Sequence, residues 1–370
     1  MDGQSTLDVI TFFIFLMLYA YISRELEIWR MASEIEAYIS LFKRARDRAL
    51  SLTLNSFKSI IERSGKGDIA HVKRRVNALV DVAIIEPVSR DPFGLIRKLK
   101  LILRTAEETM EHEVRELVPL ATDVEVKNLL NLISATRYLN NIYKVVDHIY
   151  RIARKFKSLW LLMQLSAYLP FITEEVKAME SAVDAFNKGF PIGDSVGPLV
   201  AACFLERHKG LGLVQTPVPD TIVSRVFFKG REIFVVKAKG PGGNTGRIDD
   251  AVAWILERYG NDFKMIITVD AARKFEGEES GSISHGFGVA MGGTGVERFN
   301  IEELAAKYNL PLYAILIKMS ESEALSVLTK NLYEAALKAL DIVERVIVER
   351  SSEGDKVMLI GVGNTVGVPP

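Results

Sequence analysis

The chain has 370 residues, of which 48% are hydrophobic, and equal numbers of acidic and basic residues give it a formal net charge of zero. This balance argues against a general nucleic-acid-binding protein, which would carry a basic excess. The single cysteine, Cys203, excludes an internal disulfide and any CxxC metal site. We therefore expect a folded body in a reducing compartment, and the length predicts about two domains.

An unbroken apolar run, VITFFIFLMLYAYI, occupies residues 9–22. As a helix it would cover about 21 Å, against roughly 30 Å of bilayer hydrocarbon, and flanking apolar residues bring it nearer to that length. The preceding MDGQSTLD is acidic and no small-x-small cleavage site follows, which argues against a cleaved signal peptide. We predict a single transmembrane anchor over residues 1–23; a buried core helix and a helix lying in the membrane interface are the alternatives.

Basic residues follow the apolar run, beginning with Arg24 and Arg30, and none precedes it. Cytoplasmic flanks of membrane helices carry the excess of lysine and arginine. The sequence therefore predicts a single-pass protein of the cell membrane with its soluble body in the cytoplasm.

Glycine usage divides the rest of the chain. Between residues 24 and 188 glycine occurs only three times, whereas after residue 188 it occurs in clusters. Apolar residues recur at helical spacing in the first stretch, and Thr122 with Glu125 has the spacing of a capping box. We predict a helical bundle over residues 24–188, in which the apolar stretch 159–165 is a core helix ended by Pro170. An α/β domain would then occupy residues 189–370.

Strand and helix patterns alternate in this second domain. Apolar runs at 234–236, 265–269, 312–317 and 357–360 predict buried strands, and helical patterns lie at 196–208, 248–259, 301–308 and 321–348. Such alternation is typical of a mostly parallel sheet covered by helices on both faces. Ligands of such sheets bind beyond the carboxyl ends of the strands.

Three polar residues stand where that rule points. Asp194 lies in a turn that opens a helix, Asp270 directly follows the strand MIITV, and His285 lies in a glycine-bounded loop. Together they could bind a divalent metal of the zinc or nickel class. Alternatively the two aspartates could share a proton and activate water, because neighbouring like charges raise one pKa. Taken singly, each residue also has an ordinary explanation as a cap or a turn.

Two glycine-rich turns are further candidates for ligand binding. The segment KGPGGNTGR leads from a strand into a helix, where backbone amides can hold an anion. It fits neither GxxxxGK[ST] nor GxGxxG. The candidate cofactor-binding residues, from this turn and from the one after the last strand, are Gly240, Gly242, Gly243, Gly246, Gly363 and Asn364. Sharp turns within a sheet would explain the same glycines without a ligand.

Several of these motifs resemble the superfamily that joins the spore germination proteases and the hydrogenase maturation endopeptidases. IGDSVGP is similar to their acidic turn, KGPGGNTGRIDDAV to a glycine-rich strand-to-helix turn, and IITVDAA to the strand that delivers a second acid. SISHGFG resembles the maturation peptidases' histidine segment, and MGGTGVE resembles a glycine turn of the germination proteases. The resemblance implies that Asp194 and Asp270 are the paired acids and that His285 is the third metal-facing residue.

The resemblance covers roughly residues 190–370 and departs from the family pattern in one respect. In those families a Gly-x-Gly-Asn turn after the first strand precedes the acidic turn, whereas here the comparable VMLIGVGNTVG lies at the C-terminus, as in a circular permutation. The whole chain, including IEPV at 85–88 and DPFG at 91–94, also resembles an archaeal membrane-protein family of unknown activity.

These observations favour a membrane-anchored peptidase that hydrolyses a specific protein substrate. Asp194 and Asp270 would activate water, while His285 would join them in binding a metal or would polarise the substrate carbonyl. A non-catalytic module that binds a metal, nucleotide or peptide is the alternative, and a structural membrane scaffold is a third. No nucleic-acid partner is expected, and the sequence indicates no particular oligomeric state.

Overall fold

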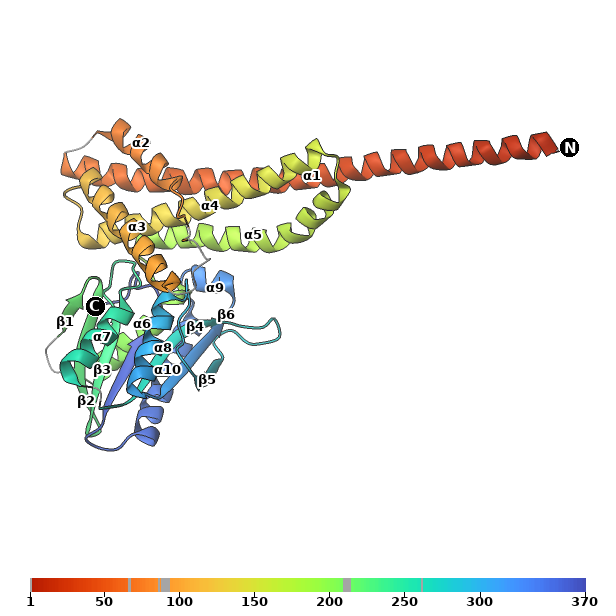
Figure 1. The fold of residues 1–370 in the computed structure, drawn as a ribbon. Coiled ribbons are helices and arrows are strands. Elements are labelled where there is room, and N and C mark those ends of the chain that lie inside the picture. The colour runs from red at the N-terminus through yellow and green to blue at the C-terminus, as the bar shows by residue number, and fades with distance from the viewer. Residues whose placement is uncertain (1, 66–67, 86, 88–93, 209–213, 261) are drawn as a thin grey trace. The chain divides into compact units, whose positions relative to one another are not determined.

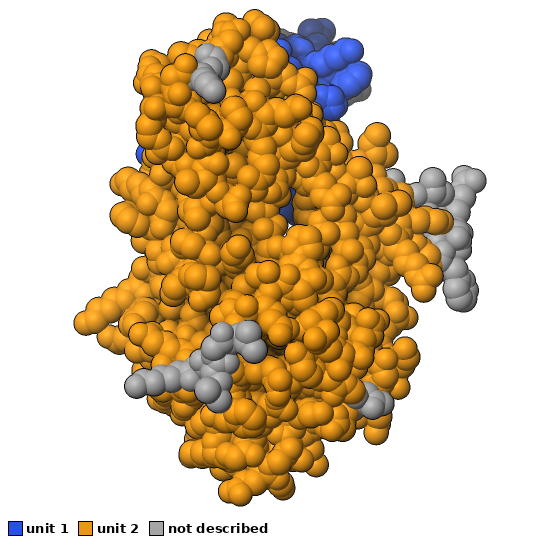
Figure 2. Space-filling view, turned by 90° about the vertical axis from the view of Figure 1, so that its left-hand side faces the viewer, with its two compact units in different colours: residues 1–48, 138–177 blue, residues 49–137, 178–370 orange. Residues whose placement is uncertain are grey.

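A computed structural model describes the chain apart from residue 1 and the segments 66–67, 86, 88–93, 209–213 and 261. Parts of the IEPV and DPFG segments thus lie outside the described residues. The described residues cluster into two compact units, which Figure 2 colours separately. Unit 1 comprises residues 1–48 and 138–177, and unit 2 comprises residues 49–137 and 178–370. Part of the helical region therefore belongs to the same compact unit as the sheet.

Unit 1 is built from three long helices, each of which also contributes residues to unit 2. They are α1 (Asp2–Ser64), α4 (Asp123–Lys155) and α5 (Leu159–Lys188). Large apolar side chains such as Phe42, Leu162 and Leu169 are fully buried in it. Helix α5 continues through Pro170, so the prediction that this proline ends the helix is wrong. Proline can remain inside a helix at the cost of one backbone hydrogen bond and a kink.

The N-terminal part of α1 extends beyond α4 and α5 (Figure 1). Its apolar residues from Leu7 to Ile22 are exposed, and buried positions begin only at Ile28. Among the described residues, α1 is the one helix long and apolar enough to cross a membrane. This agrees with a single N-terminal anchor.

Unit 2 adds shorter helices to parts of these three. They are α2 (Ile69–Val80), α3 (Leu95–Leu117), the 3-10 turn η1 (Gly193–Ser195), α6 (Val196–Arg207), α7 (Ile248–Tyr259), α8 (Val296–Tyr308), α9 (Glu321–Leu325) and α10 (Lys330–Arg350). The single helix expected over 321–348 is thus broken into α9 and α10. The break is held by the segment before η1, because Ser326 and Leu328 exchange backbone hydrogen bonds with Gly193 and Pro191.

A seven-stranded sheet forms the centre of unit 2. Its strands are β1 (Gln215–Val218), β2 (Thr221–Phe228), β3 (Arg231–Ala238), β4 (Phe263–Arg273), β5 (Ile283–Phe287), β6 (Leu312–Met319) and β7 (Lys356–Gly361). The spatial order is β1-β2-β3-β7-β4-β6-β5. The central β3, β7, β4 and β6 pair in parallel, whereas the pairings β1–β2, β2–β3 and β5–β6 are antiparallel. The expected mostly parallel sheet is therefore a mixed one.

Helices cover both faces of this sheet. One face packs Ile267 and Val269 of β4 against α6 and α10, and the other packs Ile266 against α7 and α8. Side chains alternate between the faces along a strand. Asp270 therefore belongs to the face covered by α7 and α8.

The last strand of the chain lies in the middle of the sheet. Strand β7 pairs in parallel with β3 on one side and with β4 on the other, and Val357 to Ile360 are fully buried. This confirms the buried strand predicted at 357–360 and places it in the middle of the sheet.

Candidate active site

The two predicted acids come together because α6 begins directly against the ends of β4 and β7. At Gly197, in the first turn of α6, an added Cβ would lie 2.1 Å from the carbonyl oxygen of Val362 and 2.5 Å from that of Val269. At Gly363, which has φ +132°, a Cβ would lie 2.0 Å from the carbonyl oxygen of Asp194. Only glycine permits approaches this close. They bring the turn that carries Asp194 to the carboxyl end of β4.

Backbone amides hold both carboxyl groups. The amide of Asn364 donates to Asp194 Oδ2 at 2.8 Å, which confirms that the turn after β7 lies beside Asp194. Asp270 Oδ1 accepts from the amide of Ala271 at 2.7 Å, and its Oδ2 accepts from the amide of Gly292 at 3.2 Å. The two carboxyl groups are thus fixed by main chain of β4 and of the loops that follow β7 and precede α8.

Burial raises the pKa of both acids. The pKa of Asp194 is raised by desolvation, against which the amide of Asn364 acts. Asp270 is only 5% exposed, and its pKa lies well above the usual value because of burial and, next, because of the negative charge of Asp194. The negative charge of Asp194 therefore favours the protonated form of Asp270.

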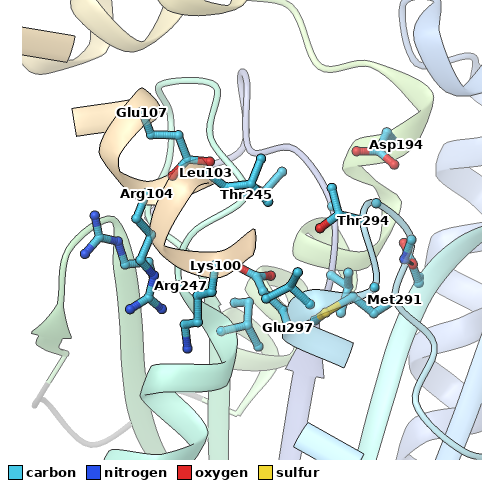
Figure 3. A pocket seen from close by; sticks show the side chains of 18 of the residues that line it. Lys100, Leu103, Arg104, Glu107, Asp194, Thr245, Arg247, Met291, Thr294 and Glu297 are labelled. Carbon is cyan, nitrogen blue, oxygen red and sulfur yellow. Dashed lines mark hydrogen bonds between the residues drawn. The ribbon is translucent and has the colours of Figure 1, made fainter. Parts of the chain in front are cut away.

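Both acids line one pocket of about 420 Å³. Its walls come from α3, from the ends of β4 and β7, and from the glycine-rich loop 292–295 before α8. Figure 3 places Asp194 on one side of the pocket and Arg104, Glu107 and Arg247 on the other. A volume of this size is typical of small-ligand and substrate sites.

The α3 wall is attached to α7 by partly buried ion pairs. Lys100 contacts Asp249 and lies 2.9 Å from Asp250, and Arg104 contacts Asp250 and lies 3.6 Å from Asp249. Asp249 is 1% exposed and also accepts a hydrogen bond from Asn300 at 2.6 Å. These contacts neutralise two of the pocket's cations and join helices that are about 150 positions apart in sequence.

The pocket has two further carboxyl groups that were not predicted, those of Glu107 and Glu297. Burial, followed by the negative charges of Asp249 and Glu107, raises the pKa of Glu297 to about 8. Burial also raises the pKa of Glu107. Glu297 had a signal, since it opens a helix directly after a glycine-rich turn. No sequence signal marked Glu107, because no local motif indicates that α3 lies against the sheet.

His285 does not join the two aspartates. It lies on the edge strand β5 rather than in a loop, and its side chain is exposed. In the strand register His285 is opposite Ile315, which is opposite Val269, so it shares a face with Val269 and not with Asp270. Within the part of the chain that is described, no three His, Cys, Asp or Glu residues lie close enough to hold a metal ion. The predicted metal set of Asp194, Asp270 and His285 is therefore not assembled.

The glycine turn 240–246 is packed against protein at Gly240 and Gly242, whereas Gly243, Gly246 and Asn364 line a second pocket of about 370 Å³. An added Cβ at Gly242 would lie 3.0 Å from the side chain of Lys127, and one at Gly240 would lie 1.8 Å from the carbonyl oxygen of Val368. The amide of Gly243 already donates to Asn128. This turn therefore packs against α4 and the C-terminal segment, whereas Gly363, of the other predicted turn, does line the pocket of the two acids.

Comparison with known families gives two matches, which together cover nearly all of the chain. Residues 9–189 match the N-terminal domain of a protein family of unknown function, DUF1512, and residues 192–369 match the C-terminal domain of the same family. No curated protein matches the chain. The chain therefore belongs to the DUF1512 family and carries both of its domains.

Proposed function

We propose that this protein is a membrane-anchored peptidase that cleaves a specific protein substrate with Asp194 and Asp270 as a water-activating pair. The observation that carries the proposal is that the two carboxyl groups line one pocket and that the charge of Asp194 raises the pKa of Asp270. Strongly shifted carboxyl groups in a pocket are characteristic of acid–base catalysis.

The chemistry needs one ionised and one protonated carboxyl group. The ionised member takes a proton from water while the water oxygen attacks the peptide carbonyl carbon. The protonated member donates its proton to the carbonyl oxygen. Collapse of the tetrahedral intermediate breaks the carbon–nitrogen bond. The proton taken from water passes to the leaving amine, and one hydroxyl group of the intermediate gives its proton to the pair as the new carboxyl group forms. The pair thereby regains its single shared proton.

One feature of the pocket and one of the sequence suit a peptide substrate. Glycines at 292, 293, 295 and 363 line it, and their lack of side chains lets an extended backbone approach the acids. The resemblance of the IGDSVGP and IITVDAA segments to the maturation endopeptidases and germination proteases supports the same assignment. The anchor would hold this site at the membrane, and the basic residues after it predict that the site faces the cytoplasm.

The proposal is tested with the full chain in lipid nanodiscs and a library of peptides from a digested proteome, in which new termini are detected by mass spectrometry. Asp194→Asn and Asp270→Asn should each lower cleavage about a thousandfold, because either change removes a proton acceptor of the pair. Asp262→Asn is the matched control. It makes the same change at the opposite end of β4, where Asp262 pairs with Lys356 at 2.9 Å, and should leave cleavage unchanged.

Three results would refute the proposal. One is full cleavage by both pocket variants. Another is loss of cleavage on chelation with recovery on added metal, which would assign the chemistry to a metal ion. The third is peptide binding that depends on Asp194 and Asp270 without any cleavage, as expected of a binding module.

A further inference from the structure

We propose that the turn between α4 and α5, residues 154–160, is a second membrane contact that rests on an anionic lipid surface beside the anchor. The proposal concerns unit 1, rests on α1 crossing the bilayer, and is independent of any hydrolytic activity. It follows from where the turn lies along α1, from its exposed aromatic side chains, and from its charge.

A series of contacts fixes the level of the turn on α1. Asn140 accepts a hydrogen bond from Arg46 at 3.3 Å, Tyr150 contacts Glu36, and Lys157 Nζ lies 3.1 Å from Glu25 Oε1. As the position on α4 increases, the position on α1 decreases, so the two helices are antiparallel. The end of α4 therefore lies toward the apolar run of α1.

The last of these contacts lies at the depth of the lipid headgroups. Glu25 is three residues after Ile22, the end of the apolar run, or about 4.5 Å along the helix axis. A bilayer of about 40–45 Å has a hydrocarbon core of about 30 Å, so each headgroup layer is several ångströms thick. The contact between Lys157 and Glu25 thus holds the turn beside this layer. Figure 1 shows the turn where α1 begins to extend alone.

Large aromatic side chains around this level are exposed to solvent. Phe156 is 68% exposed and Trp160 is 66% exposed on the turn, and Trp29 of α1 is 69% exposed. They remain exposed, although neighbouring Leu162 and Ala153 are fully buried. Tryptophan and other aromatic residues concentrate at membrane–water interfaces, where an apolar ring meets the headgroups.

The charge of the turn suits an anionic surface. Arg151, Arg154, Lys155 and Lys157 are the charged residues between Asp147 and Glu174, so this stretch contains no acid. Arg151 pairs with Asp147 and Lys157 with Glu25, whereas Arg154 and Lys155 are exposed. Clustered basic residues next to a membrane helix are attracted to anionic lipids. Aromatic and basic groups at one level favour lipid over a protein partner.

Tryptophan fluorescence of the full chain in vesicles tests the contact, with lipids brominated near the headgroup as quenchers. The Trp29→Phe/Trp254→Phe variant retains only Trp160, and the Trp29→Phe/Trp160→Phe variant retains only Trp254, which lies on α7 in unit 2. The emission of Trp160 should fall about twofold in vesicles that contain anionic lipid, as expected of an interfacial ring. The emission of Trp254 should not change.

Charge reversal adds a matched pair of variants. Arg154→Glu/Lys155→Glu should abolish the quenching of Trp160, whereas Lys43→Glu/Arg44→Glu, at exposed positions of α1 far from the turn, should leave it unchanged. Equal quenching of Trp160 and Trp254 in chains that resist carbonate extraction would overturn the proposal. Protection of Trp160 by a second copy, detected as crosslinking at the turn, would overturn it as well. Release of the full chain from the vesicles by carbonate would show instead that α1 does not cross the bilayer, and the proposal would fall with it.

Discussion

Two pairs of aspartates in unit 2 are almost equally buried but have opposite surroundings. The pocket pair, Asp194 and Asp270, accepts hydrogen bonds from backbone amides, and among the described residues no cation forms an ion pair with either acid. The α7 pair, Asp249 and Asp250, contacts Lys100 and Arg104 of α3. Asp249 is 1% exposed and Asp270 is 5% exposed, so burial does not distinguish the two pairs.

The difference lies in the counterions. Desolvation of a carboxylate is offset when a lysine or arginine contacts it, and the acid then stays charged and holds two helices together. Without a cation the same burial favours the protonated form, which a catalytic acid needs. One pair therefore stabilises the wall of the pocket, and the other has the raised pKa values that the proposed chemistry needs.

The largest loss of stability should come from removing strand β7. Strand β7 lies between β3, against which α7 packs, and β4, which carries Asp270. A chain that ends at residue 355 would leave two half-sheets with unpaired, apolar central strands, and we expect unit 2 to unfold. Loss of the cooperative thermal transition by circular dichroism would be the readout. A truncated protein with the melting temperature of the intact chain would contradict the assignment of β7 to the core.

Much of this sheet could be predicted from sequence, because its central strands are continuous apolar runs. Asp270 was located by its position directly after such a run, and Asp194 by the turn before α6. The antiparallel strands β1, β2 and β5 were missed. For β2 and β3 a signal existed, since Lys229-Gly230, both with positive φ, is a two-residue hairpin turn between two strand-like segments.

The α3 wall could not be predicted, because its contacts are purely tertiary. Lys100 and Arg104 lie on an amphipathic helix whose charges resemble an ordinary solvated face. Their partners are about 150 positions away. The two aspartates that open α7 have a sufficient local explanation, since acids stabilise helix N-termini. His285 was misplaced for a related reason, because the glycines around it indicated a loop while pairing with β6 made it a strand.

The next largest loss of stability should come from a substitution in the α7 pair. Asp249→Asn leaves Lys100 and Arg104 with one carboxylate fewer, and the free energy of unfolding should fall by about 2–3 kcal/mol, less than for a fully buried pair because both cations are partly exposed. Glu302→Gln, which breaks the exposed pair with Arg298, is the control and should change it by less than about 0.5 kcal/mol.

Above neutral pH, Asp270→Asn should leave the stability of the folded state unchanged or raise it. The folded chain holds the proton of Asp270 more tightly than the unfolded chain, so raising the pH destabilises the folded state, and the asparagine variant lacks this effect. Its melting temperature at pH 8 should equal or exceed that of the unmodified chain, although catalysis is lost. Thermal unfolding at pH 8 gives the melting temperatures, and urea titrations give the free energies of unfolding of both variants. A loss of stability in Asp270→Asn as large as that in Asp249→Asn would mean that the two pairs do not differ in role.

The smallest effect on stability concerns Glu297, which shares one property with each pair. Its side chain lines the pocket, as those of Asp194 and Asp270 do, and its pKa is raised in part by the charge of Asp249. Its pKa is raised to about 8 from an ordinary value of 4.5. The stabilising contribution of a raised pKa is fully present below the unfolded value and is lost as the pH rises through the folded value. Stability should therefore decline between about pH 4.5 and 8, and Glu297→Gln should flatten part of this decline. The comparison is a series of melting temperatures across that range for the unmodified chain, Glu297→Gln and the control Glu302→Gln. Parallel curves for all three would show that Glu297 is charged in the folded protein, and that the cations of α3 neutralise it as they do Asp249.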